Sequence, residues 1–191
     1  MMDVVLQERY TVEDLEALLE SGENYELLNG ELIGMSPTKF THGVITAEIT
    51  RVITAFVYEH KLGLCTGAEM GIKFSDENLI APDLGFVASE RLTKRSINNK
   101  GWLVTPPDLV VEVASKSNTP ANLDDKMAVY FQYGVKQVWI IYPNRRKVMV
   151  YRSESDIQVL LRDDVLSGSD ILPGFEVRVR SLFTGLDFLE I

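Results

Sequence analysis

Glu112 is the residue whose setting most requires a chemical explanation. It is the only charged residue in the run Leu109-Val110-Val111-Glu112-Val113-Ala114, whose short, β-branched-rich character predicts a strand buried on both faces. An ionised carboxylate in such a strand is costly unless it is paired or bound to a metal ion. Glu112 is therefore predicted to belong to a functional site. The competing interpretation is a buried ion pair, or a strand end where the carboxylate meets solvent.

Asp83 is a second acid at the start of a predicted strand. It lies in the segment Ala81-Pro82-Asp83-Leu84-Gly85-Phe86-Val87, where the proline fixes the backbone just before the strand begins. Mg²⁺ prefers one or two carboxylates together with water and substrate oxygens, which Asp83 and Glu112 could supply from neighbouring strands. Aspartate after proline is also common in turns, so Asp83 could equally be a turn residue.

Lys126 is a candidate cation for the same site. A step of 100° per residue puts it at the edge of the apolar stripe formed by Leu123, Met127 and Tyr130, from where it could reach the sheet. There it would orient or deprotonate an attacking water, or stabilise charge that develops on a phosphate. The alternative is a lysine at the helix border whose ammonium group extends into solvent.

Glu31 and His42 complete the set of candidate residues. Glu31 follows the Asn29-Gly30 pair and is either a further metal contact, an orienter of the water, or a hairpin residue that faces solvent. His42 lies at the start of a long amphipathic segment, so it is either a polar helix-start residue or a contact to the scissile phosphate.

The elements that must position these residues follow from hydrophobic periodicity and turn signals. Thr11 and Asp14 resemble a capping box for a short first helix, and Asn29-Gly30 predicts a hairpin. Apolar residues at intervals of three and four predict a helix from Thr41 to about Lys61. Further strands are expected at 71–74, 84–87, 147–151 and 157–161, with a polar loop at 90–101 and a closing segment at 172–175.

A βαβ unit fixes the fold class. The Glu112 strand at 109–114 is followed by a predicted helix at 120–133, with Thr119 as N-cap and Gly134 as C-cap, and then by a strand at 136–141. Two strands joined by such a crossover should be parallel and right-handed. The fold class predicted is α/β.

Composition supports one globular domain over residues 1–191. The chain is 46% hydrophobic and 25% charged, and no segment has the length of a membrane span or the pattern of a signal peptide, so we expect a cytoplasmic protein. Cys65 is the only cysteine and is assigned no chemistry. A net charge of −9 argues against a broad basic surface for nucleic acid, although bound Mg²⁺ could bridge carboxylates to phosphates.

Several segments together resemble a known family. They are Tyr25 to Glu31, Met35-Ser36-Pro37, His42, Pro82-Asp83, Pro107 to Ser115, Lys126 to Tyr130, Gly134-Val135, Trp139 and Leu172 to Phe175. In order and spacing they resemble the Uma-type putative restriction endonuclease family, a branch of the PD-(D/E)XK nuclease superfamily. The resemblance runs from about Tyr10 to Phe183, which is the expected core of the domain.

The resemblance implies a restriction-endonuclease-like mixed sheet flanked by helices, and Mg²⁺-dependent (or Mn²⁺-dependent) hydrolysis. Asp83 and Glu112 match the two metal-binding acids of the superfamily. Its lysine two positions after the second acid is replaced here by Ala114, and Lys126 fits as the displaced lysine, with Lys116 a weaker substitute. Two positions depart from relatives: Asn122 stands where they often carry an acid, and Tyr142 where they often have Asp.

Three functions are compatible with these features. The first is a metal-dependent nuclease with DNA as substrate, in which Asp83 and Glu112 hold the metal and Glu31, His42 and Lys126 assist; a homodimer is possible. The second is a catalytically inactive interaction protein on a nuclease scaffold. The third is a hydrolase of another phosphate ester, which the acidic composition favours.

Overall fold

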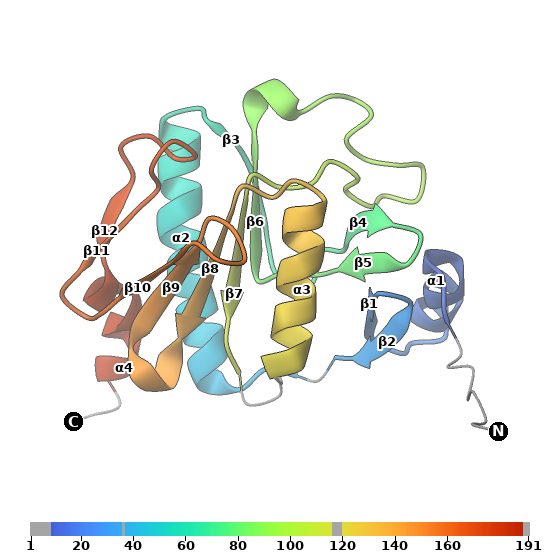
Figure 1. Cartoon of the computed structure of the whole chain (residues 1–191), viewed down its shortest axis with the longest axis horizontal. Helices are drawn as coiled ribbons and strands as arrows, with labels where there is room; N and C mark the ends of the chain where they lie inside the picture. The colour runs from blue at the N-terminus through green and yellow to red at the C-terminus, as the bar shows by residue number, and fades with distance from the viewer. Residues whose placement is uncertain (1–8, 36, 116–119, 189–191) are drawn as a thin grey trace.

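The computed structural model describes residues 9–35, 37–115 and 120–188. Its centre is a six-stranded sheet with the order β10-β9-β8-β7-β6-β3 (Figure 1). The strands are β3 (Gly63–Thr66), β6 (Leu84–Ala88), β7 (Leu109–Val113), β8 (Gln137–Tyr142), β9 (Lys147–Tyr151) and β10 (Ile157–Leu160). Only the β7–β8 pair is parallel in this sheet, and its other pairs are antiparallel. The predicted mixed α/β sheet is therefore present.

The predicted βαβ unit forms the middle of this sheet. The helix α3 (Pro120–Gln132) connects β7 to β8 and ends at Gly134, which has a left-handed φ of 85°. The Gly134 N–H donates to the carbonyl of Phe131, and the next N–H, of Val135, donates to the carbonyl of Tyr130. These bonds satisfy the last carbonyls of the helix, as the glycine signal predicted. The predicted N-cap, Thr119, lies outside the described residues.

Two helices cover opposite faces of the central sheet. In Figure 1, α3 lies in front of the sheet and the long helix α2 (Phe40–Glu59) lies behind it. Val111 and Val113 of β7 pack in one cluster with Ile45, Ile49 and Ile53 of α2, whereas Val110 packs with Met127 and Tyr130 of α3. Because side chains alternate along a strand, Glu112 shares the α3 face with Val110. The predicted two-faced burial of this strand is confirmed.

A second, smaller sheet lies beside the first, with the order β2-β1-β5-β4. Its strands are β1 (Tyr25–Leu28), β2 (Glu31–Gly34), β4 (Ile72–Ser75) and β5 (Asn78–Ile80). Asn29 and Gly30 both have positive φ, of 51° and 76°, which confirms the tight Asn-Gly hairpin between β1 and β2. The helix α1 (Val12–Glu20) packs against this sheet, and its predicted capping box of Thr11 and Asp14 is present.

The C-terminal segment closes the α2 side of the central sheet. It contains the hairpin of β11 (Val165–Ser167) and β12 (Glu176–Arg178), the 3₁₀ turn Val179–Phe183 and the helix α4 (Thr184–Asp187). Two other 3₁₀ turns, Ser89–Arg91 and Pro143–Arg145, follow β6 and β8. Sequence patterns did not predict β3, β5, β11 or β12, since runs of three or four residues carry little periodicity. None of the helices in the described ranges is long and apolar enough to span a membrane.

Candidate functional site

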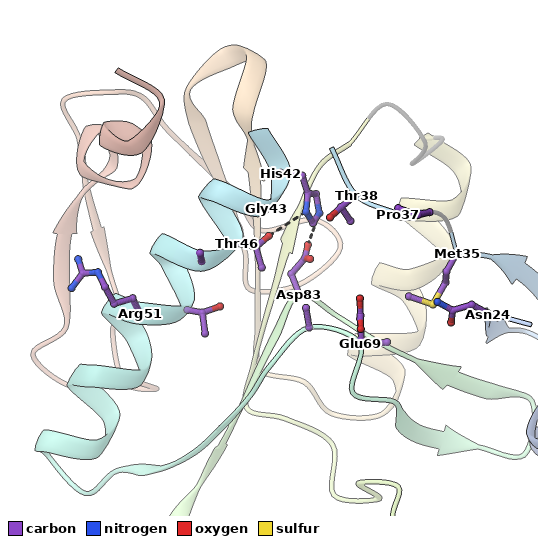
Figure 2. Close-up of a pocket in the computed structure, with 14 residues that line it drawn as sticks. Asn24, Met35, Pro37, Thr38, His42, Gly43, Thr46, Arg51, Glu69 and Asp83 are labelled. Carbon is purple, nitrogen blue, oxygen red and sulfur yellow. Dashed lines mark hydrogen bonds and ion pairs between the residues drawn. The ribbon is translucent and has the colours of Figure 1, made fainter. Parts of the chain in front are cut away.

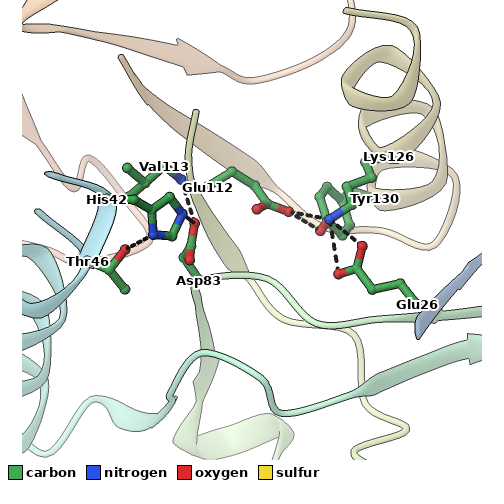
Figure 3. Close-up of polar contacts among 8 residues, drawn as sticks. All are labelled: Glu26, His42, Thr46, Asp83, Glu112, Val113, Lys126 and Tyr130. Carbon is green, nitrogen blue, oxygen red and sulfur yellow. Dashed lines mark hydrogen bonds and ion pairs between the residues drawn. The ribbon is translucent and has the colours of Figure 1, made fainter. Parts of the chain in front are cut away.

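Glu112 sits at the centre of a buried polar cluster (Figure 3). Its side chain is only 7% exposed, and its Oε1 accepts a hydrogen bond of 2.6 Å from the hydroxyl of Tyr130. The ammonium group of Lys126 lies 3.5 Å from the same oxygen. Both partners come from α3, one helical turn apart, so the helix that covers the sheet also supplies the groups that stabilise the buried carboxylate. The buried ion pair that was the competing interpretation of Glu112 is therefore present, with Lys126 as the cation, but a neutral hydroxyl makes the shorter contact.

Lys126 is held more closely by an acid that sequence patterns did not identify. Its Nζ lies 2.8 Å from Oε2 and 3.1 Å from Oε1 of Glu26, which is 5% exposed in β1. Oε1 of Glu26 also accepts a 2.9 Å hydrogen bond from the backbone N–H of Ala81. Glu26 therefore connects the small sheet, the lysine and the segment that carries Asp83. An acid inside the apolar segment Tyr25–Leu28 is the same kind of signal that identified Glu112.

Asp83 lies on the other side of Glu112. In the antiparallel β6–β7 pair, Leu84 faces Val111, so Asp83 precedes β6 at the level of Glu112. Its Oδ2 accepts a 2.7 Å hydrogen bond from the backbone N–H of Val113 and lies 3.2 Å from Nε2 of His42. The two carboxylates predicted to share a cation therefore come from adjacent strands, as expected.

His42 reaches Asp83 from the first turn of α2. Its Nδ1 lies 3.3 Å from the hydroxyl of Thr46, one turn further along the helix, which fixes the ring with Nε2 towards the carboxylate. The hydrogen bond with Asp83 raises the pKa of His42 above its usual value, against the lowering effect of burial. His42 is thus positioned by the acid it contacts.

Four of the five predicted residues come together, and Glu31 does not. Glu31 is exposed at the first position of β2, paired with Leu28 next to the hairpin turn. It is not among the residues that line the cavity at the carboxylates. The acid that the small sheet contributes is Glu26, from the strand before the turn.

The cluster opens into a cavity of about 150 Å³. Its polar lining comprises Glu26, Thr38, His42, Asp83, Glu112, Ser115, Asn122 and Lys126. A larger cavity of about 730 Å³ adjoins it and shares Met35, Thr38, His42, Ala81 and Asp83 (Figure 2). The buried acids therefore meet a cleft with room for a substrate, which a purely structural ion pair would not require.

Burial and neighbouring charges shift the pKa values of two groups in the cluster. Burial raises the pKa of Glu112 to about 7; Lys126 opposes this rise, and the charges of Asp83 and Glu26 add to it. Burial alone would lower the pKa of Lys126, but Glu112 and Glu26 outweigh it and raise that pKa above its ordinary value. Lys126 is therefore a stable ammonium group. Lys126 and, when protonated, His42 face the carboxyl groups of Glu26, Asp83 and Glu112, and Glu112 is only partly ionised near neutral pH.

A metal ion in this cluster would need ligands beyond the acidic side chains. Within the described ranges, no three His, Cys, Asp or Glu side chains gather in an arrangement that could hold a metal ion on their own. A cation at Asp83 and Glu112 would complete its coordination with water and substrate oxygens, as Mg²⁺ commonly does in proteins. Asn122 also lines the cavity and has a neutral side-chain oxygen.

Comparison with known proteins agrees with this fold. A crystal structure of a putative nuclease belonging to DUF820 from Anabaena variabilis superposes with a TM-score of 0.78 at 20% identity, covering 92% of this chain and 98% of that chain. No curated protein matches the chain. The model of the Uma2 family, described as putative restriction endonuclease, matches residues 12–180. Since this match spans most of the chain, the protein belongs to the Uma2 family of putative restriction endonucleases.

Proposed function

We propose that this protein is a cytoplasmic, divalent-cation-dependent nuclease that hydrolyses phosphodiester bonds of DNA. The observation that carries the proposal is the convergence of Asp83, Glu112 and Lys126, far apart in sequence, on one cleft. Asp83 and Glu112 would hold Mg²⁺, or Mn²⁺ in its place. When bound, the cation supplies an activated water and neutralises charge on the phosphate. Family membership supports the assignment.

The protein groups around the cation have separate tasks. Lys126, with its raised pKa, acts as a hydrogen-bond donor that positions the attacking water or stabilises the phosphate oxygens, and not as the general base. Glu26 keeps the ammonium group beside Glu112. Tyr130 fixes the rotamer of Glu112 through the 2.6 Å hydrogen bond, and His42 does the same for Asp83.

In this proposal, the substrate strand binds in the larger cavity. It is bordered by the first turns of α2 and by the segment before that helix, and it reaches the carboxylates through Asp83. Its polar lining includes Asn24, Thr46 and Arg51, and its apolar lining includes Met35 and Pro37. A strand in this cavity would present a phosphate at Asp83.

Cleavage of a labelled oligonucleotide tests the proposal. We expect activity with Mg²⁺ or Mn²⁺, none with a chelator, and a loss of at least about 100-fold in Asp83→Asn, Glu112→Gln and Lys126→Met. Glu31→Gln is the matched control, because this exposed acid lies outside the cavity, and its activity should equal that of the wild type. Wild-type rates in Asp83→Asn and Glu112→Gln would refute the proposal.

The net charge of −9 favours one alternative substrate class, a smaller phosphate ester that needs no basic surface. Assaying single-stranded and duplex oligonucleotides beside small phosphodiesters separates this alternative from DNA cleavage. A third possible outcome is an inactive scaffold. The presence of Ala114 at the position of the superfamily's usual lysine is consistent with a loss of activity. That outcome predicts no stabilisation by millimolar Mg²⁺, whereas a functional metal site predicts a shift that Glu112→Gln abolishes.

A further inference from the structure

The strand β10 ends the central sheet with an edge that no other strand occupies in the described part of the chain. The direction of its backbone groups follows from the hairpin with β9. The N–H of Arg152 donates to the carbonyl of Asp156 at 2.9 Å, so this pair is hydrogen-bonded. In an antiparallel ladder, bonded and non-bonded pairs alternate. Gln158 and Leu160 therefore bond to β9, and the backbone groups of Ile157 and Val159 point outwards.

The apolar side chains of this strand are unusually exposed. Ile157, Val159 and Leu161 are 43%, 49% and 60% exposed, while Leu160, on the opposite face, is 6% exposed and packs in the cluster that includes α2. The exposed face is the one that α3 covers further along, over β7 and β8. An edge strand with β-branched residues and open backbone groups is a template for pairing with another strand.

The next turn limits which residues can pair. The N–H of Leu161 donates to the carboxylate of Asp164 at 2.7 Å, and the carbonyl of Leu161 accepts the N–H of Asp164 at 3.0 Å. The open groups are therefore those of Ile157 and Val159 alone. Two copies of this strand satisfy each other only in one antiparallel register, in which Ile157 of each copy faces Val159 of the other and Gln158 lies on the two-fold axis.

Charge complementarity supports this register. Acids outnumber bases by one at the turn before β10, and bases outnumber acids by one at the end of β10. The charged residues at the turn are Arg152, Glu154 and Asp156. Those at the end of β10 are Arg162, Asp163 and Asp164, together with Arg178 and Arg180. The last two are counted there because both contact Asp163. An antiparallel partner brings the acidic turn before β10 of one copy, which carries Glu154, near the basic end of β10 of the other, which carries Arg162.

We propose that the edge of β10 binds a second copy of this chain, joining two six-stranded sheets into one continuous sheet. Four backbone hydrogen bonds form between Ile157 and Val159 of the two copies, and their four β-branched side chains pack on one face. A two-fold axis perpendicular to the sheet keeps the α3 faces on the same side. Because β7 runs parallel to β10, the cavities at Glu112, at the C-terminal end of β7, would lie at opposite strand ends of the continuous sheet. The interface itself does not depend on the proposed nuclease activity.

Light scattering after size exclusion, over a dilution series of the full chain, tests the pairing. We expect wild-type protein at twice 21.5 kDa, dissociating on dilution. Val159→Pro removes an outward N–H and places its ring on the open edge, a position where proline is tolerated, so this variant should be monomeric and folded. Val159→Thr keeps the N–H and the branched side chain and should remain dimeric.

A charge reversal tests the register and does not depend on the proline. Arg162→Glu should weaken the dimer, and adding Glu154→Arg should restore it, because only the antiparallel partner brings the turn with Glu154 near the strand end with Arg162. A wild-type protein that is monomeric at every concentration, a dimer that survives Val159→Pro, or a failure of the second reversal to rescue the first would each overturn the proposal.

Discussion

Replacing Glu112 by Gln should change the pH dependence of stability in a defined direction. Burial raises the pKa of Glu112 in the folded protein to about 7, from 4.5 in an exposed carboxyl. The folded state therefore binds this proton more tightly than the unfolded chain does. Wild-type stability falls as pH rises from about 4.5 to about 7 and is level above that, because the folded protein then carries a buried charge.

The size of the effect follows from the same two values. Between pH 5 and pH 8 the ionisation of Glu112 removes about 2–3 kcal/mol from the wild-type free energy of unfolding. Gln has no proton to lose and keeps a side-chain oxygen for the Tyr130 hydroxyl. The free energy of unfolding of Glu112→Gln should therefore rise relative to wild type by about 2–3 kcal/mol between these pH values, or roughly 5–10 °C in Tm for a domain of this size.

The assay is urea unfolding followed by circular dichroism at pH 5 and pH 8. A chelator is present so that no bound divalent ion stabilises the ionised carboxylate. Only the change in the difference between the two proteins is used, so titrations common to both cancel. Glu31→Gln, at an exposed acid outside the cavity, is the control for a Glu-to-Gln change away from the cluster. A change of less than about 0.5 kcal/mol for Glu112→Gln would show that the carboxylate is not destabilised by its burial.

Three further measurements probe the buried charges and the thiol. Lys126→Met leaves two buried carboxylates without their ammonium partner, so urea unfolding at pH 8 should show a loss of about 3–5 kcal/mol; an unchanged midpoint would contradict the geometry. Burial would raise the pKa of Asp108, but hydrogen bonds from Lys136, Ala88 and Arg91 outweigh it and lower that pKa. The resulting stability is present above pH 3.8 and is lost as pH falls through the lower folded value, so Asp108→Asn should cost about 3 kcal/mol at pH 7, and its difference from wild type should shrink as pH falls below 3.8. Burial raises the pKa of Cys65 to about 11, so its reaction with an aromatic disulfide at pH 8 should be about 100-fold slower in the folded protein than in urea, and equal rates would mean the thiol is open to solvent.

The elements with strong local signals were predictable from sequence. The run Leu109–Val113, the proline and glycine that bracket α3, and the apolar intervals of α2 each satisfy a local rule of propensity or capping, and each forms as expected. The need of Glu112 for a partner also follows from sequence, since a charged residue at a buried strand position needs one wherever the strands pair. Short strands such as β3 and β5 carry too few residues for a period to be detected.

Sequence alone could not distinguish Glu26 from Glu31. Both acids flank the same Asn-Gly turn, and local rules fix the hairpin but not the direction it faces. Packing decides it: Leu27 joins the cluster under α1, whereas Glu26 and Leu28, on the other face of β1, turn towards α3. The lysine that Glu26 meets is 100 residues away in sequence, so their pairing depends on how the small sheet docks beside the large one. Local propensity and periodicity thus determined the elements and the acid-bearing strand ends, and only the long-range packing of two sheets around α3 decided which carboxylates share Lys126.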